Sequence, residues 1–260
     1  MATLTISKKD LCSLVGQEMS DEDLSSVLPM VKCEVEGFEG DGVKIETTHE
    51  RPDLISTAGI ARAIRGFLGK EKGLPVFKIQ KGNIKVLVDP SILGVRPITR
   101  CAVVRGLKMS EAAILDIMQL QEKLHAIYCK NRESASIGVY DLDTLKPPIV
   151  YGGVKPEEIH FVPLESNREM DGREILTLLP KGKEYAWTLE GKEVYPLLAD
   201  STGRVLSMPP IVNSDDTKIT EKTRNFFIDV SGLNEKNVNE ALTIIVTSLG
   251  GRGGTIETVT

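Results

Sequence analysis

One stretch, residues 203–232, constrains the fold of this chain more than any other. It holds two apolar runs that are each followed by small polar residues: Ser207 follows Val205-Leu206, and Asp229 follows Phe226-Phe227-Ile228. Prolines and a cluster of turn-forming residues separate the runs, which predicts two short strands joined by a long connection. Strands that end on polar residues suit a pocket with an apolar floor and a polar lip, although a plain hairpin has the same spacing.

The length and composition are those of an ordinary globular protein. The chain has 260 residues, of which 41% are hydrophobic and 27% charged, enough for one large or two modest domains. A formal net charge of −5 argues against a broad surface that coats DNA or RNA, although a local patch could still dock one nucleic-acid end. No apolar run reaches the ~20 residues of a membrane span, and the N-terminus carries no apolar signal core. We therefore expect a cytoplasmic protein without membrane contact.

The sequence predicts neither a disulfide framework nor a metal site. Its four cysteines are far apart, and no C-x-x-C pair or suitable histidines accompany them: Cys12, Cys33, Cys101 and Cys129. Reduced, buried thiols are expected. Asp141 and Asp143 could suggest a cation site, but two aspartates in a loop more often cap the backbone amides of a turn, which is the interpretation we prefer.

Residues 1–82 predict a small α/β domain. Ser7 and Ser20 are each placed to cap a short helix, and alternating apolar residues predict strands at 31–38 and 43–47.

A longer helix is expected to run from Arg51 to Leu68. Its middle is rich in small residues around Gly59, which would let it pack closely on the sheet. The tail 254–260 alternates like a strand that returns to a sheet, and it could complete this small domain.

Residues 83–253 predict a larger, mixed α+β domain, so the whole chain is predicted to be α+β. Ser110 and Asn234 are expected to cap its two long helices. Gln121 and His125 lie one turn apart, off the apolar stripe of the first helix, and could face a pocket. A lone histidine on a helix is more often a surface or core residue. Strands are expected at 84–88, 98–104, 176–180 and 193–199.

No common catalytic motif occurs at a usable position. The sequence has no dinucleotide fingerprint, P-loop, HExxH or GxSxG pattern, and the glycine-rich run 250–254 follows a helix instead of a strand. The catalytic group is therefore unknown. Any enzymatic activity is expected to work by positioning a water on an already reactive bond.

Four ordered motifs resemble those of one family. They are HERPDLIS at 49–56, LQEKLH at 120–125, SIGVYDLDTL at 136–145, and SMPPIVNSDDTKIT at 207–220 followed by TRNFFIDVSG. Together they are similar to the β subunit of phenylalanyl-tRNA synthetase, archaeal and eukaryotic type. The family's β chain is much longer, so this sequence would correspond to its N-terminal part.

The resemblance implies an editing function. It makes residues 1–82 a structural domain, and 83–253 a domain that hydrolyses tyrosine wrongly attached to tRNA(Phe). The implied partners are the tyrosine-carrying 3′ end of tRNA(Phe) and the synthetase α subunit of the full heterotetramer. ATP and Mg belong to the full synthetase, so no cofactor and no aminoacylation are expected from this fragment.

The resemblance also implies site residues. Gln121 and Arg132 would line the approach of the tRNA end, and Arg132 has the geometry to bind a phosphate or carboxylate. The pocket for the amino acid would be formed by Leu198, Ser207, Asn213, Asp229 and Ser231.

Two residues depart from the family pattern, and a rival interpretation stays open. Tyr140 stands where a histidine is usual, and Ser231 stands where a threonine is common. The rival is a non-catalytic scaffold that docks tRNA or partner subunits. The two interpretations differ in whether the pocket near Ser207 and Asp229 is open or filled by side chains.

Overall fold

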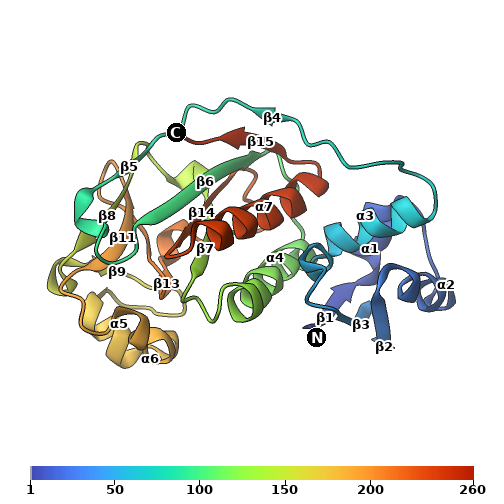
Figure 1. Ribbon diagram of the computed structural model, residues 1–260, viewed down its shortest axis with the longest axis horizontal. Coiled ribbons are helices and arrows are strands. Elements are labelled where there is room, and N and C mark those ends of the chain that lie inside the picture. The colour runs from blue at the N-terminus through green and yellow to red at the C-terminus, as the bar shows by residue number, and fades with distance from the viewer. Residues whose placement is uncertain (1) are drawn as a thin grey trace.

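Alternating apolar residues build a three-stranded antiparallel sheet at the N-terminal end of the computed structural model, which describes residues 2–260. Its strand order is β1-β3-β2, and helices pack against it (Figure 1). The elements are β1 (Ala2–Ser7), α1 (Lys8–Val15), α2 (Asp21–Val27), β2 (Cys33–Glu39), β3 (Gly42–Thr47) and α3 (Thr57–Phe67). The predicted helix caps are confirmed, since Ser7 accepts from the Asp10 amide and Ser20 forms a capping box with Asp23.

The predicted helix from Arg51 to Leu68 is wrong in its first part. Residues Pro52–Ile55 form a 3-10 turn, and Ser56 is extended before α3 begins at Thr57. Ser56 caps this new helix by accepting from the Gly59 amide at 3.1 Å. A Cβ added at Gly59 would meet the carbonyl of Asp53 in the 3-10 turn first, and not the sheet.

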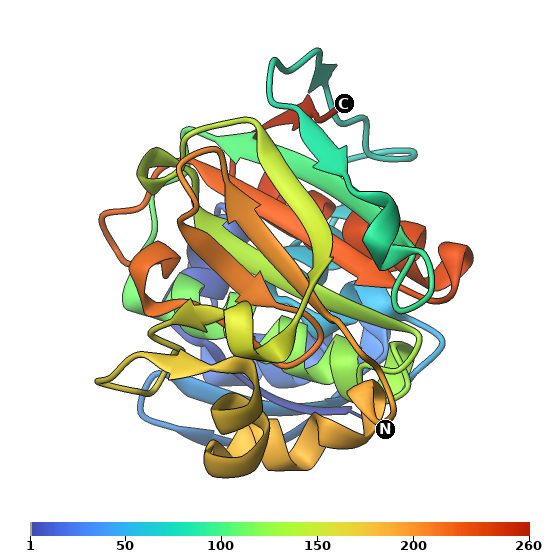
Figure 2. The ribbon, with the colours of Figure 1, turned by 90° about the vertical axis from the view of Figure 1, so that its left-hand side faces the viewer.

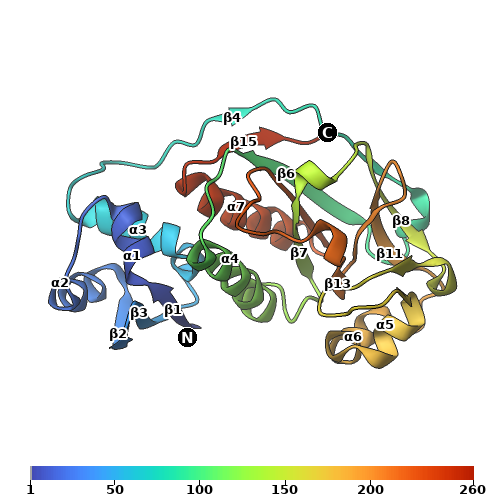
Figure 3. The ribbon, with the colours of Figure 1, turned by 180° about the vertical axis from the view of Figure 1, so that it is seen from behind.

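The C-terminal tail does not complete the N-terminal sheet. A long segment leaves α3 and passes over the molecule to β4 (Ile79–Gln80), beside the tail strand β15 (Thr255–Thr258) (Figures 1 and 3). β15 pairs parallel with β4 and antiparallel with β6 (Ile98–Arg105), so it belongs to the central sheet of the larger part. The domain boundary at 82 stays a prediction, because one hydrophobic core runs through both parts.

The central sheet has the order β4-β15-β6-β14-β7, with β14 (Phe226–Gly232) paired on both sides. One of its faces packs on α4 (Glu111–Lys123) and α7 (Glu235–Gly251), and α4 also reaches the N-terminal sheet. The caps predicted at Ser110 and Asn234 are confirmed. β7 spans Ala135–Asp141.

A second five-stranded sheet, of order β13-β12-β11-β8-β5, lies against the other face of the central sheet (Figure 2). A hydrophobic cluster fills the space between the two sheets. The strands are β5 (Val86–Val88), β8 (Ile149–Val154), β11 (Tyr195–Asp200), β12 (Val205–Met208) and β13 (Val212–Asn213).

Helices α5 (Gly172–Leu178) and α6 (Pro180–Tyr185) cover the outer side of the second sheet, with a small ribbon of β9 (His160–Phe161) and β10 (Met170–Asp171). The strand predicted at 176–180 is therefore wrong. A capping box formed by Asp171 and Glu174 starts a helix there, and a short apolar run does not distinguish helix from strand.

A buried ion cluster joins the two parts of the molecule. Arg252, after α7, donates to both Asp10 oxygens at 3.0 and 2.8 Å and to Asp116 Oδ2 at 2.7 Å. The other Asp116 oxygen accepts from the Thr57 amide at 2.9 Å and its hydroxyl at 2.7 Å. The cluster therefore links α1, α3, α4 and the end of α7.

Two glycines of α3 give a matched test of its packing. A Cβ at Gly59 would overlap the Asp53 carbonyl, whereas a Cβ at Gly66 would meet nothing. We expect Gly59→Ala to lower the free energy of unfolding by roughly 1–3 kcal/mol, because the turn must move away. Gly66→Ala should raise it by about 1 kcal/mol through helix propensity. Denaturant unfolding of both variants checks this, and equal effects would contradict the close approach.

Candidate active site

Strand β14 presents one face to the helices and the other to the second sheet. Phe226, Ile228 and Val230 join the helix-side core, so Phe227, Asp229 and Ser231 face the second sheet. Asp229 lies in mid-strand, between Cys101 on β6 and Gly138 on β7. The strand was predicted to end on Asp229 and Ser231; it ends just past Ser231, at Gly232, so Asp229 lies inside the strand and not at its end.

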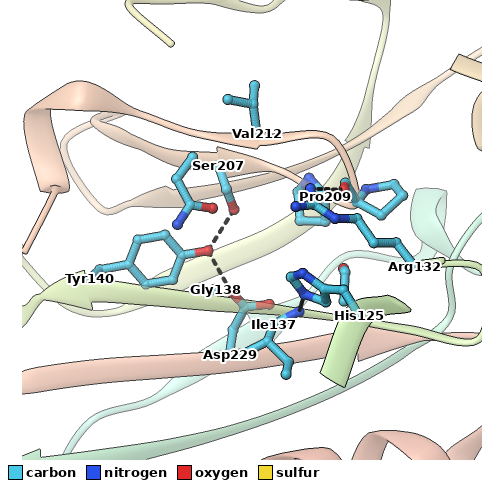
Figure 4. A pocket seen from close by; sticks show the side chains of 12 residues that line it. His125, Arg132, Ile137, Gly138, Tyr140, Ser207, Pro209, Val212 and Asp229 are labelled. Carbon is cyan, nitrogen blue, oxygen red and sulfur yellow. Dashed lines mark hydrogen bonds between the residues drawn. The ribbon is translucent and has the colours of Figure 1, made fainter. Parts of the chain in front are cut away.

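A tyrosine hydroxyl lies between the two sheets at Asp229 (Figure 4). Tyr140 of β7 donates to Asp229 Oδ1 at 2.5 Å, and its hydroxyl lies 2.8 Å from Ser207 Oγ on β12. Because the phenol has one proton, Ser207 donates to it in return. Gly138 leaves room for this arrangement, since a Cβ there would overlap both the phenol and the carboxylate.

Burial controls the protonation of the Tyr140–Asp229 pair. Tyr140 and Asp229 are 1% and 2% exposed. Burial raises the pKa of Asp229 to about 6, against the opposing effects of the Tyr140 hydrogen bond and the Arg96 charge. Burial and the neighbouring Asp229 charge raise the pKa of Tyr140 well above its usual range. Near neutral pH a protonated phenol therefore donates to a buried carboxylate.

Two cavities that share part of their walls lie at this site, and the smaller one adjoins the Tyr140 hydroxyl. The smaller has a volume of about 20 Å³, room for one water, and Tyr140, Ser207 and Asp229 form part of its wall. The larger has a volume of about 470 Å³ and extends between α4 and residues 164–165, 179–181 and 218–219. The residues common to both walls are His125, Arg132, Ile137, Val212 and Asn213.

Arg132 is held by the protein itself. Its Nη1 donates to the carbonyls of Pro210 and Ile211 at 3.1 and 2.9 Å, and its Nη2 donates to Glu122 at 3.0 Å. Its guanidinium also stacks on the Tyr185 ring, 4.4 Å from the centroid. Arg132 does line the cavities, but its terminal nitrogens brace the turn after β12 and do not form a free fork for a phosphate.

The remaining predicted site residues separate into two groups. Gln121 lines the larger cavity and donates to the Ile137 carbonyl at 3.3 Å, and Asn213 on β13 lines both cavities. Leu198 pairs with Ser207 on β11 but is buried in the core between the sheets. Ser231 is fully buried and contacts Arg96 and Ser136, and it contributes to neither cavity wall.

His125 is the wall residue that sequence reasoning set aside. Helix α4 continues into a π-helical turn, Leu124–Tyr128, which carries His125 toward the cavities. The backbone amide of Ile137 donates to its Nε2 at 2.8 Å. Its spacing of four from Gln121 was the only signal in the sequence, because the π turn and the contact with β7 arise from tertiary packing.

The acidic pair Asp141 and Asp143 shapes a turn, as predicted. Asp141 accepts from the Asp143 amide at 3.0 Å and from the Thr223 hydroxyl at 2.6 Å, and Asp143 accepts from Asn225 at 2.9 Å. Within residues 2–260, no three His, Cys, Asp or Glu side chains gather as a metal site. Over the same residues, no helix has the length and apolar character needed to cross a bilayer.

Known proteins similar to this chain identify the family. Residues 113–245, which include every residue of both cavity walls, match the model of the B3/4 domain. The phenylalanine–tRNA ligase β subunit of Archaeoglobus fulgidus is 44% identical over 259 residues, and that of Pyrococcus furiosus is 43% identical over 265 residues. Each alignment covers the whole of this chain. This chain belongs to the phenylalanyl-tRNA synthetase β-subunit family.

A solved structure of the same β-subunit family shares the fold. An N-terminal fragment of the phenylalanyl-tRNA synthetase β subunit from Pyrococcus horikoshii matches with a TM-score of 0.95 and 40% identity. The match covers 99% of this chain and 76% of that one. The chain spans about half the length of the curated relatives, 47% of the Archaeoglobus and 48% of the Pyrococcus furiosus subunit.

The raised pKa of Asp229, about 6 against 3.8, predicts a pH-dependent stability. Between these values the folded chain keeps a proton that the unfolded chain releases, so the free energy of unfolding falls as pH rises. Two pKa units correspond to roughly 3 kcal/mol. We expect the wild type to lose roughly 2–3 kcal/mol relative to Asp229→Asn between pH 4 and pH 7 in denaturant titrations. If the free energy of unfolding has the same pH dependence in both proteins, Asp229 is not a buried carboxylate with a raised pKa.

Proposed function

We propose that this chain is the editing part of a phenylalanyl-tRNA synthetase and hydrolyses the ester of tyrosine wrongly attached to tRNA(Phe). The observation that carries the proposal is the bound hydroxyl of Tyr140. Asp229 accepts from it at 2.5 Å, and the Ser207 hydroxyl lies 2.8 Å away, so this pair is complementary to a phenol. The larger cavity, which shares part of its wall with the cavity at this pair, would provide space for the rest of an aminoacylated nucleotide.

The same pair supplies the discrimination that editing needs. A phenylalanine ring in the place of the phenol would leave the Asp229 acceptor and the Ser207 donor buried and unpaired. An unpaired buried polar group costs on the order of 1–3 kcal/mol, and more when it is charged. A site built around a hydroxyl can therefore reject the analogue without it far better than an apolar pocket can reject an added hydroxyl.

The hydrolysis itself requires little from the protein. An aminoacyl ester is already activated, so holding it beside a water and stabilising the developing charge can supply most of the barrier reduction. Gln121, Asn213 and His125 present polar atoms in the cavity wall. The reaction as proposed uses no cofactor.

Tyr140 has to move for a substrate ring to reach Asp229. The smaller cavity, at about 20 Å³, has room for a water but not for a ring, and the Tyr140 side chain forms part of its wall. A substrate phenol would make the bonds that Tyr140 makes, so the exchange replaces two hydrogen bonds by two of the same kind. The internal tyrosine then acts as a competitor of the substrate.

A second function is favoured by the same filled pocket. If Tyr140 stays in place, the chain is a non-catalytic scaffold that docks tRNA or partner subunits. Arg132 also favours this second function, because its terminal nitrogens already donate to protein oxygens. The two functions predict different outcomes for substitutions at Tyr140.

The proposal includes the partners of the complete synthetase. The 3′ end of tRNA(Phe) would enter the larger cavity past Lys181 and Lys218, two cations in its wall. The α subunit, ATP and Mg would act elsewhere in the complete synthetase, where aminoacylation takes place. A cytoplasmic location follows from this role.

Deacylation of Tyr-tRNA(Phe) and Phe-tRNA(Phe) by the purified chain tests the proposal. We expect the tyrosyl ester to be hydrolysed far faster, and we expect Asp229→Ala to slow it by roughly 10–100-fold, since 1–3 kcal/mol of recognition is lost. Asp21→Ala is the control, because Asp21 pairs with Lys8 at the surface. An Asp229→Ala protein that stays folded and removes tyrosine at the parental rate would exclude this recognition.

Tyr140→Phe separates the two functions. It removes the internal hydroxyl, so the ring is held less firmly and both polar partners become free for a substrate. We expect hydrolysis of Tyr-tRNA(Phe) to rise severalfold, with Phe-tRNA(Phe) unaffected, in the same assay. Tyr140→His, which restores the residue usual in the family, should act in the same direction. If no folded variant hydrolyses either ester, the scaffold function is correct.

A further inference from the structure

Two buried N–H groups in the cavity wall have no hydrogen-bond partner. Seven buried side-chain N or O atoms within residues 2–260 lack a partner, and two of them belong to residues that line both cavities: His125 Nδ1 and Arg132 Nε. Their side chains are 3% and 6% exposed. Buried N–H groups in native proteins are almost always paired with protein, water or a ligand, so two unpaired groups on side chains of one wall mark a place where an acceptor in the cavity could bind.

The proton of His125 is fixed on the unpartnered nitrogen. Because the Ile137 amide donates to Nε2 at 2.8 Å, Nε2 is the acceptor of the ring and Nδ1 carries the hydrogen. Burial lowers the pKa of His125 well below 6.5, and the charges of Arg132, Lys181 and Arg96 lower it further. The imidazole therefore stays neutral near pH 7 and acts as a donor, not as a proton carrier.

The direction of the Arg132 group is fixed as well. The guanidinium is held by the carbonyls of Pro210 and Ile211, the Glu122 carboxylate and the Tyr185 ring. None of these groups accepts from its Nε–H. Figure 4 shows the imidazole of His125 and the guanidinium of Arg132 on the same side of the pocket, beyond Asp229. Both donors are thus set before any ligand arrives, which is the condition for electrostatic stabilisation of a reacting group.

We propose that His125 Nδ1–H and Arg132 Nε–H bind the carbonyl oxygen of the aminoacyl ester and stabilise the negative charge that develops on it. This inference rests on the hydrolytic function proposed above. The water oxygen bonds to the carbonyl carbon, and the carbonyl electron pair moves onto the oxygen held by the two donors. The pair returns as the bond to the ribose oxygen breaks, and that oxygen takes a proton from the added water.

Two substitutions at His125 separate donation from packing. His125→Gln can place its amide oxygen near the Nε2 position and still accept from the Ile137 amide, but it lacks the donor at Nδ1. His125→Asn keeps a donor near Nδ1 and loses the bond to Ile137. We expect His125→Gln to lower kcat about 100-fold with KM nearly unchanged, the effect of removing one such donor. His125→Asn should retain more activity while being less stable.

Two kinetic results would overturn the donor role. One is a folded His125→Gln protein with the parental kcat. The other is a pH–rate profile in which the wild type has a limb between pH 5 and 8 that His125→Gln abolishes, because this would make His125 a general base.

Nuclear magnetic resonance tests the inference without catalysis. The chain has three histidines, His49, His125 and His160, so ¹⁵N-histidine labelling resolves the side chain of interest. We expect His125 to show a proton on Nδ1 whose resonance moves downfield with a 3′-amide analogue of tyrosyl-adenosine. Adenosine monophosphate should leave it unchanged. An equal shift with adenosine monophosphate, or a proton on Nε2, would refute the assignment.

The two levels of the proposal fail separately. If the amide analogue shifts the His125 Nδ1 proton resonance as expected but the wild type does not hydrolyse Tyr-tRNA(Phe), the donor pair is supported and the hydrolytic function is refuted. If the His125→Gln variant hydrolyses Tyr-tRNA(Phe) as fast as the wild type, the hydrolytic function stands and the donor pair is refuted.

Discussion

The hydroxyl of Tyr140 joins the two sheets of the larger part, and the site is arranged around it. It lies between Asp229 of the central sheet and Ser207 of the second sheet, in a layer filled mainly by apolar side chains. A carboxylate buried this deeply needs a donor, and the missing side chain of Gly138 leaves the space in which the phenol reaches it. The polar contact that links the two sheets is thus also the one on which the proposed recognition of tyrosine rests.

The cavity wall divides into groups that are bonded within the protein and groups that are not. The terminal nitrogens of Arg132 hold the turn after β12, and the Nε2 of His125 accepts from β7, so these side chains are rigid. Each keeps one N–H with no partner. In the reaction proposed above, donors placed rigidly in advance need no reorganisation when charge develops on the ligand.

Local signals in the sequence were reliable where the backbone decides the outcome. The caps at Ser7, Ser20, Ser110 and Asn234 were predicted correctly, because a side-chain oxygen three residues before an amide acts within one turn. The errors lie where packing decides. The tail strand β15 joined the central sheet because β6 offered an open edge. The strand predicted at 176–180 was instead a local misreading, since the capping box of Asp171 and Glu174 makes residues 176–178 helical.

The sequence by itself determined the family and the α+β class, and it predicted Ser207, Asn213 and Asp229, which the structure places in one cavity wall, because these depend on residue identity and order. Only the tertiary structure decided which side chains meet. In the folded chain, Leu198 and Ser231 lie outside the cavity walls, and Tyr140 and His125 lie in them. Arg132 donates to the turn after β12. The physical reason is that alternation along a strand gives a residue's face but not its neighbours across the sheets. Those neighbours come from strands that are 67 and 89 residues apart in the chain.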